Sequence, residues 1–199
     1  MTDGNKERPA FLIVDMVKDN LDERNNFIIT PFARQIVGPI NNLIGVFRRE
    51  GWPIVFPTDA YHREDFIFKS HLPPFSVVGT EGALVADELD YRAGTDLWLP
   101  KPRFSAFFGV QLDQWLRERG VTLCAVAGLS TNFCVLTTVM DAVCHDFKAV
   151  LLEDCSASTT ASLHEQTVNL YRRNPIYPLM RVLSSLELVA ELLASSAQA

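Results

Sequence analysis

Clusters of positive charge are missing from this chain of 199 residues, which has 18 Lys and Arg against 24 Asp and Glu. Nucleic acids and anionic membranes attract clustered Lys and Arg, and here such residues form only short pairs such as Arg48-Arg49. No run of about 18 apolar residues occurs, so we expect no membrane-spanning helix. With 48% hydrophobic residues the chain can still bury a substantial core. These absences predict a globular protein that binds neither nucleic acid nor a membrane.

Cysteine is also scarce, and its spacing excludes some functions. The four cysteines are Cys124, Cys134, Cys144 and Cys155, and no two of them form a Cys-x-x-Cys pair. A zinc or redox motif is therefore not expected, and reduced thiols favour a cytoplasmic location. Residues 1–8 form a polar tail that lacks the apolar core of a secretory signal.

The remaining sequence alternates between short apolar runs and segments of helical periodicity. Strands are expected at 10–15, 53–57, 96–100, 121–127, 147–152 and 179–182. Helices are expected at 30–50, 110–119, 131–145, 161–173 and 184–195, the first with Thr30 as N-cap and Pro31 after it. Alternation of this kind predicts one α/β domain over 1–199. Its three α/β/α layers would enclose a six-stranded, mostly parallel, Rossmann-like sheet.

Three residues with catalytic potential follow strands of that predicted sheet. Ligand crevices of parallel sheets lie beyond the carboxyl ends of the strands. Asp15 ends the first strand, Lys101 follows the third, and Cys134 begins the helix after the fourth. The topology therefore predicts that an acid, a cation and a thiol meet at one edge of the sheet.

Cys134 is the strongest candidate nucleophile among the cysteines. A thiol in the first turn of a helix feels the positive end of the helix dipole, which lowers its pKa, and the nearby N–H groups can hold an oxyanion. The alternative is an ordinary buried thiol, which free cysteines often are. Cys124, Cys144 and Cys155 fit that alternative better.

Asp15 and Lys101 have structural interpretations beside the catalytic one. Asp15 could simply cap a loop at a strand end, and Lys101 could be a solvated loop lysine. Beside a thiol, Asp15 would instead act as general base and then general acid. Lys101 would hold the Asp15 carboxylate and favour the thiolate.

Four segments together resemble the isochorismatase-like cysteine hydrolases, which include nicotinamidases and N-carbamoylsarcosine amidase. The segments are Phe11–Val17 (FLIVDMV), Gly79–Gly82 (GTEG), Lys101–Phe107 (KPRFSAF) and Gly128–Val135 (GLSTNFCV). The resemblance implies a catalytic triad of Asp15, Lys101 and Cys134. It also implies a cis peptide before Ser130, with an oxyanion hole made of the Ser130 and Cys134 N–H groups. A homo-oligomer, dimeric or tetrameric, is implied as well.

The resemblance also bears on substrate and metal. True isochorismatases lack the nucleophilic cysteine, so Cys134 favours hydrolysis of a small amide or related C–N bond through a thioester. Nicotinamidases carry a metal site with Asp-x-His, whereas Tyr61 occupies the histidine position here between Asp59 and His62. We therefore expect no metal and no cofactor, although a metal-assisted nicotinamidase and a non-catalytic binding protein stay open as alternatives.

The substrate pocket is expected to be built from the long segment 58–78 and from residues lent by a partner subunit. Its candidate residues are Asn20, His62, Thr131 and Phe133. Relatives often have an aromatic residue at the Asn20 position. His62 and His71 could equally be ordinary loop histidines.

Overall fold

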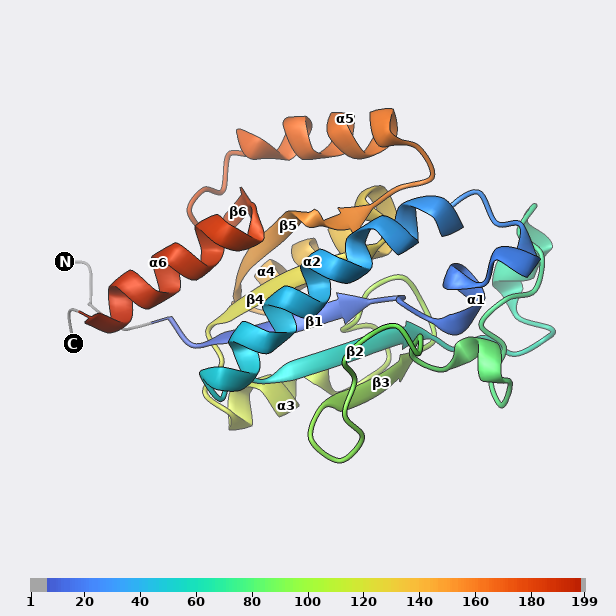
Figure 1. The fold of residues 1–199 in the computed structure, drawn as a ribbon, viewed down its shortest axis with the longest axis horizontal. Coiled ribbons are helices and arrows are strands. Elements are labelled where there is room, and N and C mark those ends of the chain that lie inside the picture. The colour runs from blue at the N-terminus through green and yellow to red at the C-terminus, as the bar shows by residue number, and fades with distance from the viewer. Residues whose placement is uncertain (1–6, 198–199) are drawn as a thin grey trace.

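A six-stranded parallel sheet forms the centre of the molecule in a computed structural model that describes residues 7–197 (Figure 1). The strands are β1 (Pro9–Val14), β2 (Ile54–Asp59), β3 (Leu97–Lys101), β4 (Leu123–Leu129), β5 (Lys148–Ala157) and β6 (Met180–Leu183). Their order in the sheet is β3-β2-β1-β4-β5-β6, and all five neighbouring pairs are parallel. The chain order reverses between β1 and β4, which is where ligands bind in open α/β sheets.

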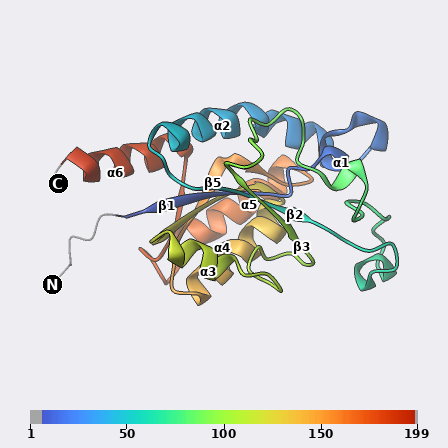
Figure 2. The ribbon, with the colours of Figure 1, turned by 90° about the horizontal axis from the view of Figure 1, so that it is seen from below.

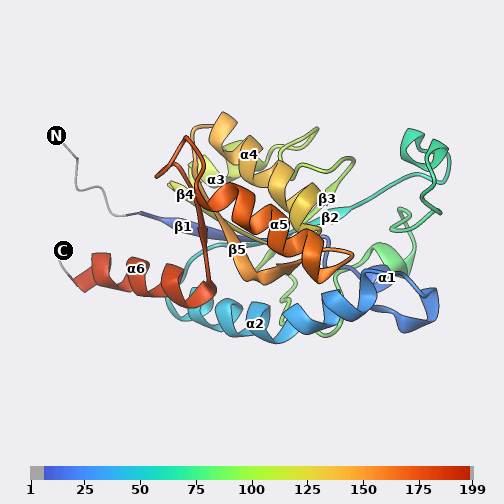
Figure 3. The ribbon, with the colours of Figure 1, turned by 90° about the horizontal axis from the view of Figure 1, so that it is seen from above.

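Helices cover both faces of this sheet. They are α1 (Lys18–Leu21), α2 (Thr30–Arg49), α3 (Leu112–Glu118), α4 (Leu136–Cys144), α5 (Ala161–Arg172) and α6 (Ser185–Ala197). Figure 2 shows α2 and α6 on one face and α3, α4 and α5 on the other, and Figure 3 shows the same separation from the opposite side. The predicted three-layer α/β/α fold is confirmed.

The central strands are apolar on both faces because both faces are covered. In β1, Phe11 and Ile13 pack into the cluster under α2 and α6, whereas Leu12 and Val14 pack into the cluster under α3, α4 and α5. The buried apolar residues of α2, which recur at helical spacing, lie in the first cluster, with Phe47 fully buried. Burial of both faces fixes where β1 and β4 end, and so fixes the edge that carries the site.

The start of α2 differs from the prediction in one detail. The helix begins at Thr30, but the N-cap residue is Ile29, and Pro31 lies in the first turn. The Thr30 hydroxyl is buried without a hydrogen-bond partner among the described residues. Thr30 is thus the first helical residue, and its predicted role as N-cap is wrong.

The two long connections contain more local structure than the sequence indicated. The segment after β1 forms α1 and the 3₁₀ turn η1 (Glu23–Asn25), and the segment after β2 holds η2 (Phe66–Lys69) and η3 (Glu81–Ala83). The predicted helix 131–145 is divided into a π-helical turn, η4 (Thr131–Val135), and α4. These turns surround the site described below.

Two residues of the predicted polar tail 1–8 belong to the described part of the chain. Residues 1–6 lie outside the described part of the chain. Glu7 is paired with Lys148 and Arg181, and the Arg8 N–H donates to Thr122 Oγ1 over 2.9 Å. These two residues are therefore bound near the amino ends of β4, β5 and β6, at the opposite end of the sheet from the site described below. No helix within residues 7–197 is long and apolar enough to cross a membrane.

Candidate active site

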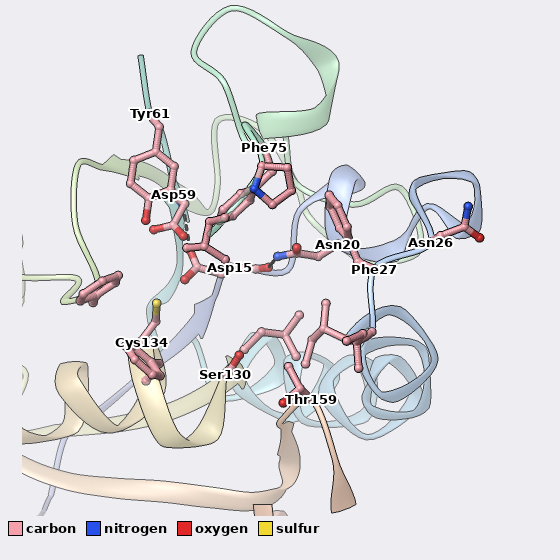
Figure 4. A pocket seen from close by; sticks show the side chains of 17 residues that line it. Asp15, Asn20, Asn26, Phe27, Asp59, Tyr61, Phe75, Ser130, Cys134 and Thr159 are labelled. Carbon is pink, nitrogen blue, oxygen red and sulfur yellow. Dashed lines mark hydrogen bonds between the residues drawn. The ribbon is translucent and has the colours of Figure 1, made fainter. Parts of the chain in front are cut away.

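The three predicted residues converge at the carboxyl edge of the sheet. Asp15 follows β1 in a left-handed conformation with φ of 54°, Lys101 is the last residue of β3, and Cys134 lies in the η4 turn after β4. A carboxylate oxygen of Asp15 lies within 4.8 Å of the Cys134 sulfur. Lys101 Nζ donates to Asp15 Oδ2 over 3.0 Å. Figure 4 shows the Cys134 sulfur pointing toward the Asp15 and Asp59 carboxyl groups.

Asp59 is a fourth member of the site that the sequence analysis treated only as a possible metal ligand. It is the last residue of β2, and its backbone N–H donates to Asp15 Oδ1 over 2.7 Å. Its carboxylate also accepts a hydrogen bond from Lys101 Nζ. The rule that selected the ends of β1 and β3 would have selected the end of β2 as well. β2 lies between those two strands in the sheet.

Lys101 is held entirely inside this site. Its side chain is fully buried, and its ammonium donates to the Asp15 and Asp59 carboxylates and to the backbone carbonyl of Arg103 at 3.1 Å. An ammonium has three donors, and all three are used here. The interpretation of Lys101 as a solvated loop lysine is wrong.

Asp15 has a pKa suited to proton transfer near neutral pH. Burial and the negative charge of Asp59 raise the pKa of Asp15 to about 7, against the opposing effect of the Lys101 ammonium. Because carboxylate and carboxylic acid are then both populated near neutrality, Asp15 can accept a proton and return it.

Cys134 differs from the expectation that a helix end would lower its pKa. Burial and the Asp15 charge raise the pKa of the Cys134 thiol well above its ordinary value, while Lys101 lowers it. Burial, together with the neighbouring carboxylates, therefore outweighs the effect of the helix end on the pKa of this thiol. The resting thiol keeps its proton, and a base is needed during any nucleophilic attack.

A cavity of about 480 Å³ opens onto these groups. Most of its lining residues are apolar or aromatic; the full set is Asp15, Asn20, Asn26, Phe27, Ile28, Ile29, Asp59, Tyr61, Leu72, Pro73, Phe75, Phe104, Leu129, Ser130, Phe133, Cys134 and Thr159. A cavity of this kind with few polar groups is typical of a small-molecule site. The peptide between Leu129 and Ser130 is cis, as the resemblance implied.

The four predicted pocket residues divide into two pairs. Asn20 and Phe133 line the cavity, and Asn20 Nδ2 donates to the Asp15 backbone carbonyl over 2.9 Å. His62 is exposed and is not part of the lining. Thr131 is fully buried behind the cavity wall, where its hydroxyl lies 2.8 Å from His164 Nδ1. Placing His62 and Thr131 in the pocket was wrong, because His62 points to solvent and Thr131 packs against α5.

Comparison with known proteins assigns the family. The isochorismatase domain model matches residues 9–181, a span that includes Asp15, Lys101 and Cys134. The chain belongs to the isochorismatase family. Among its relatives, ureidoacrylate amidohydrolase RutB of Klebsiella pneumoniae is 37% identical over 188 residues, covering 80% of this chain and 78% of that protein.

Two further isochorismatase relatives show the range of the similarity. A protein of Arabidopsis thaliana named as a probable inactive nicotinamidase is 29% identical, covering 80% of this chain and 85% of that protein. The crystal structure of N-carbamoylsarcosine amidase from Thermoplasma acidophilum superimposes with a TM-score of 0.76 at 29% identity, covering 89% of this chain and 96% of that one. Amidohydrolases of C–N bonds thus belong to the family, but membership alone does not assign an activity.

The other cysteines of this isochorismatase-family chain lie away from the cavity. Cys124 and Cys155 are buried in the two core clusters, and burial raises the pKa of both thiols. Cys144 is exposed on α4 and, like the others, is free. None of the three lines the cavity around Cys134.

Three side chains of the site carry atoms of the kind that bind metal ions. Asp15, Asp59 and Cys134 bring oxygen and sulfur atoms within 4.8 Å of one another. However, the Lys101 ammonium already bonds both carboxylates, and the raised pKa of Cys134 keeps its thiol protonated. Tyr61, at the position of the expected histidine ligand, has a raised pKa because of burial and the Asp59 charge. These residues do not fit a divalent cation, which needs deprotonated ligands.

Proposed function

We propose that this protein is a cysteine-dependent hydrolase of a small amide or related C–N bond, acting through a thioester on Cys134. The observation that carries the proposal is the placement of the Cys134 thiol beside the Asp15 carboxylate at the base of an apolar cavity. An acid with a pKa of about 7 next to a protonated thiol is the arrangement that base-assisted thiol attack requires.

In the first half of the proposed reaction, Asp15 accepts the Cys134 proton as the sulfur attacks the amide carbonyl carbon. Proton transfer and attack are coupled because burial opposes a free thiolate at rest. The developing oxyanion is held by the Ser130 and Cys134 N–H groups, the oxyanion hole that the family resemblance implies. Removal of one oxyanion donor typically costs on the order of a hundredfold or more in rate.

In the second half, Asp15 returns the proton to the nitrogen as the C–N bond breaks. Ammonia or an amine leaves, and the acyl group stays on Cys134 as a thioester. Asp15, ionised again, takes a proton from water as the water oxygen attacks the thioester carbonyl. The C–S bond then breaks, the thiol regains its proton, and a carboxylic acid is released, so water is the one reactant consumed beside the amide.

Lys101 and Asp59 are proposed as positioning residues for Asp15. Lys101 Nζ donates a hydrogen bond to Asp15 Oδ2 over 3.0 Å, and the Asp59 backbone N–H donates one to Asp15 Oδ1 over 2.7 Å. The carboxylate is thus fixed from two sides toward the thiol. The Asp59 charge raises the pKa of Asp15 while Lys101 lowers it, and the balance sets the pKa near neutrality.

The test is a screen of small amides for ammonia release, with nicotinamide included, followed by mass spectrometry of a rapidly quenched reaction. An acyl adduct on the Cys134 peptide is expected. Cys134→Ala should abolish turnover, whereas Cys144→Ala, which removes an exposed thiol away from the cavity, should retain it. Full activity of Cys134→Ala would rule out the thioester route.

The two alternatives from the sequence give different results in the same experiment. A metal-assisted nicotinamidase would lose activity with a chelator and regain it with zinc or iron. A non-catalytic member would bind an amide without releasing ammonia. A homo-oligomeric state and a cytoplasmic location remain predictions that size-exclusion chromatography and cell fractionation would test.

A further inference from the structure

The cavity wall carries little charge beyond the reacting groups. Among the described residues that line it there is no Lys, Arg or His. Its only carboxyl groups are those of Asp15 and Asp59, at the end that holds Cys134. A ligand that enters this cavity therefore meets negative charge at the reacting end and uncharged side chains elsewhere.

The one cation close to the reacting end cannot serve a substrate. Lys101 Nζ donates its three hydrogen bonds to the Asp15 carboxylate, the Asp59 carboxylate and the Arg103 carbonyl. The Lys101 side chain is fully buried. Arg103 donates to Asp65 and to the Pro102 carbonyl and does not line the cavity. A carboxylate on the substrate would thus lack a counter-ion in this part of the chain.

Aromatic side chains form two groups on the remaining walls. Phe75 contacts Tyr61 and Phe27 edge to face, with ring centroids 5.5 Å and 6.3 Å apart. On the Cys134 side, Phe104 and Phe133 contact each other edge to face, with their ring centroids 5.4 Å apart. Figure 4 shows Phe27, Phe75 and Tyr61 around the cavity that Cys134 faces. Such walls favour an apolar, flat acyl group.

One polar atom at the reacting end suits the amide itself. Asn20 is buried in the lining, and its Nδ2 is held by the Asp15 carbonyl at 2.9 Å. Its Oδ1 makes no hydrogen bond to the described residues and is therefore available to accept one from a substrate N–H. Asn20 thus provides an acceptor for the carboxamide nitrogen close to Asp15.

From these features we infer that the substrate is an uncharged carboxamide with an apolar acyl group, aromatic rings included, and that amides bearing a carboxylate are rejected. This inference rests on the proposed function for the hydrolytic step. The substrate needs no nitrogen atom in its ring, because the cavity offers neither a set of metal ligands nor a cation that would bind such an atom. A carboxylate on the acyl group would lie against uncharged walls without a counter-ion, in the field of the two buried carboxylates, and taking an unpaired charge out of water into such a site costs about a hundredfold or more in affinity.

The experiment compares matched amides: benzamide, 4-methylbenzamide and the anionic 4-carboxybenzamide. Ammonia release should give kcat/KM for the neutral pair at least about a hundredfold above that of the anion. Binding to Cys134→Ala, measured by calorimetry, should show the same order without any turnover. Binding without turnover by the native protein would refute the proposed function and leave the inference intact.

A variant at the cavity rim makes the test sharper. Leu72 lines the cavity but is 46% exposed, so a longer polar side chain there can reach solvent. Leu72→Arg should raise binding of the anion relative to benzamide severalfold, and Leu72→Gln, which is similar in polarity but neutral, should not. Equal binding of the anion and the neutral amides to Cys134→Ala, or no binding of either, would overturn the inference.

Discussion

Asp59→Asn tests the electrostatics of the site, because Asp59 is the nearest negative charge to Asp15. The Asp15 and Asp59 oxygens lie within 4.8 Å, and both accept from Lys101 Nζ. Asparagine keeps the size and an acceptor for Lys101 but removes the charge. The bond from the residue 59 backbone N–H to Asp15 at 2.7 Å does not depend on the side chain and should persist.

The magnitude follows from Coulomb's law. The two oxygens lie within 4.8 Å of each other, and two unit charges at that separation interact by about 3.5 kcal/mol at an effective dielectric constant of about 20. At about 1.4 kcal/mol for each pKa unit, this corresponds to about 2.5 units before screening. Lys101 lies between the carboxylates and screens part of the interaction, so we expect the Asp15 pKa to fall by about one to two units from its value of about 7.

The assay is kcat/KM against pH with an amide found in the screen. In the native protein kcat/KM should rise with pH through about 7, because the free enzyme needs the Asp15 base ionised. In Asp59→Asn the rise should occur at lower pH by the amount above. Alkylation of Cys134 by iodoacetamide gives a second measurement without substrate, and its rate at neutral pH should increase because the Asp59 charge raises the pKa of that thiol.

The matched control is Asp87→Asn, which removes a carboxylate that is 81% exposed and paired with Lys18 at the surface. It should leave both profiles unchanged. The electrostatic reasoning would be refuted if kcat/KM of the native protein rose at a pH far from 7. It would also be refuted if the rise in Asp59→Asn occurred at the same pH as in the native protein or at a higher pH, even with the variant still active.

Three further predictions concern stability and metal content. Lys101→Met leaves two buried carboxylates without a counter-ion and should lower the free energy of unfolding by about 3–5 kcal/mol. This loss should shrink at acidic pH, where the buried Asp15 carboxylate, whose pKa burial already raises, takes up a proton. Gly128 has φ of 109°, and a Cβ there would lie 2.0 Å from the Val14 carbonyl, so Gly128→Ala should cost at least about 3 kcal/mol in urea unfolding. Gly38→Ala, in open space within α2, should instead stabilise by about 0.5–1 kcal/mol. EDTA should not reduce activity, and one equivalent of zinc or iron that is lost in His62→Ala would contradict our metal analysis.

Much of the fold was predictable because its signals are local or periodic. The apolar runs before Asp15 and in 121–127 indicated strands covered on both faces, and the helical periodicity of 30–50 indicated a helix with one buried face. The order of strands and helices along the chain, with the rule for strand ends, was then enough to place Asp15, Lys101 and Cys134 at one edge of the sheet. The prediction of Thr30 as the N-cap was wrong because a Thr-Pro pair is compatible both with the N-cap and N1 positions and with the first two residues of the helix.

The electrostatics of the site could not be predicted in the same way, because they depend on distances between four separate segments. Sequence position placed Cys134 at a helix start and suggested a lowered pKa, whereas burial and the neighbouring carboxylates raise it. The strand-end rule could have selected Asp59, but its place between Asp15 and Lys101 depends on β2 lying between β1 and β3, and the sequence does not reveal that strand order. The apolar wall of the cavity likewise combines Phe75 with Phe104, two residues from separate loops. The sequence by itself determined the strands and the types of reacting groups, and the tertiary structure alone decided which charges face one another, because electrostatic energies depend on separation in space and on exclusion of water.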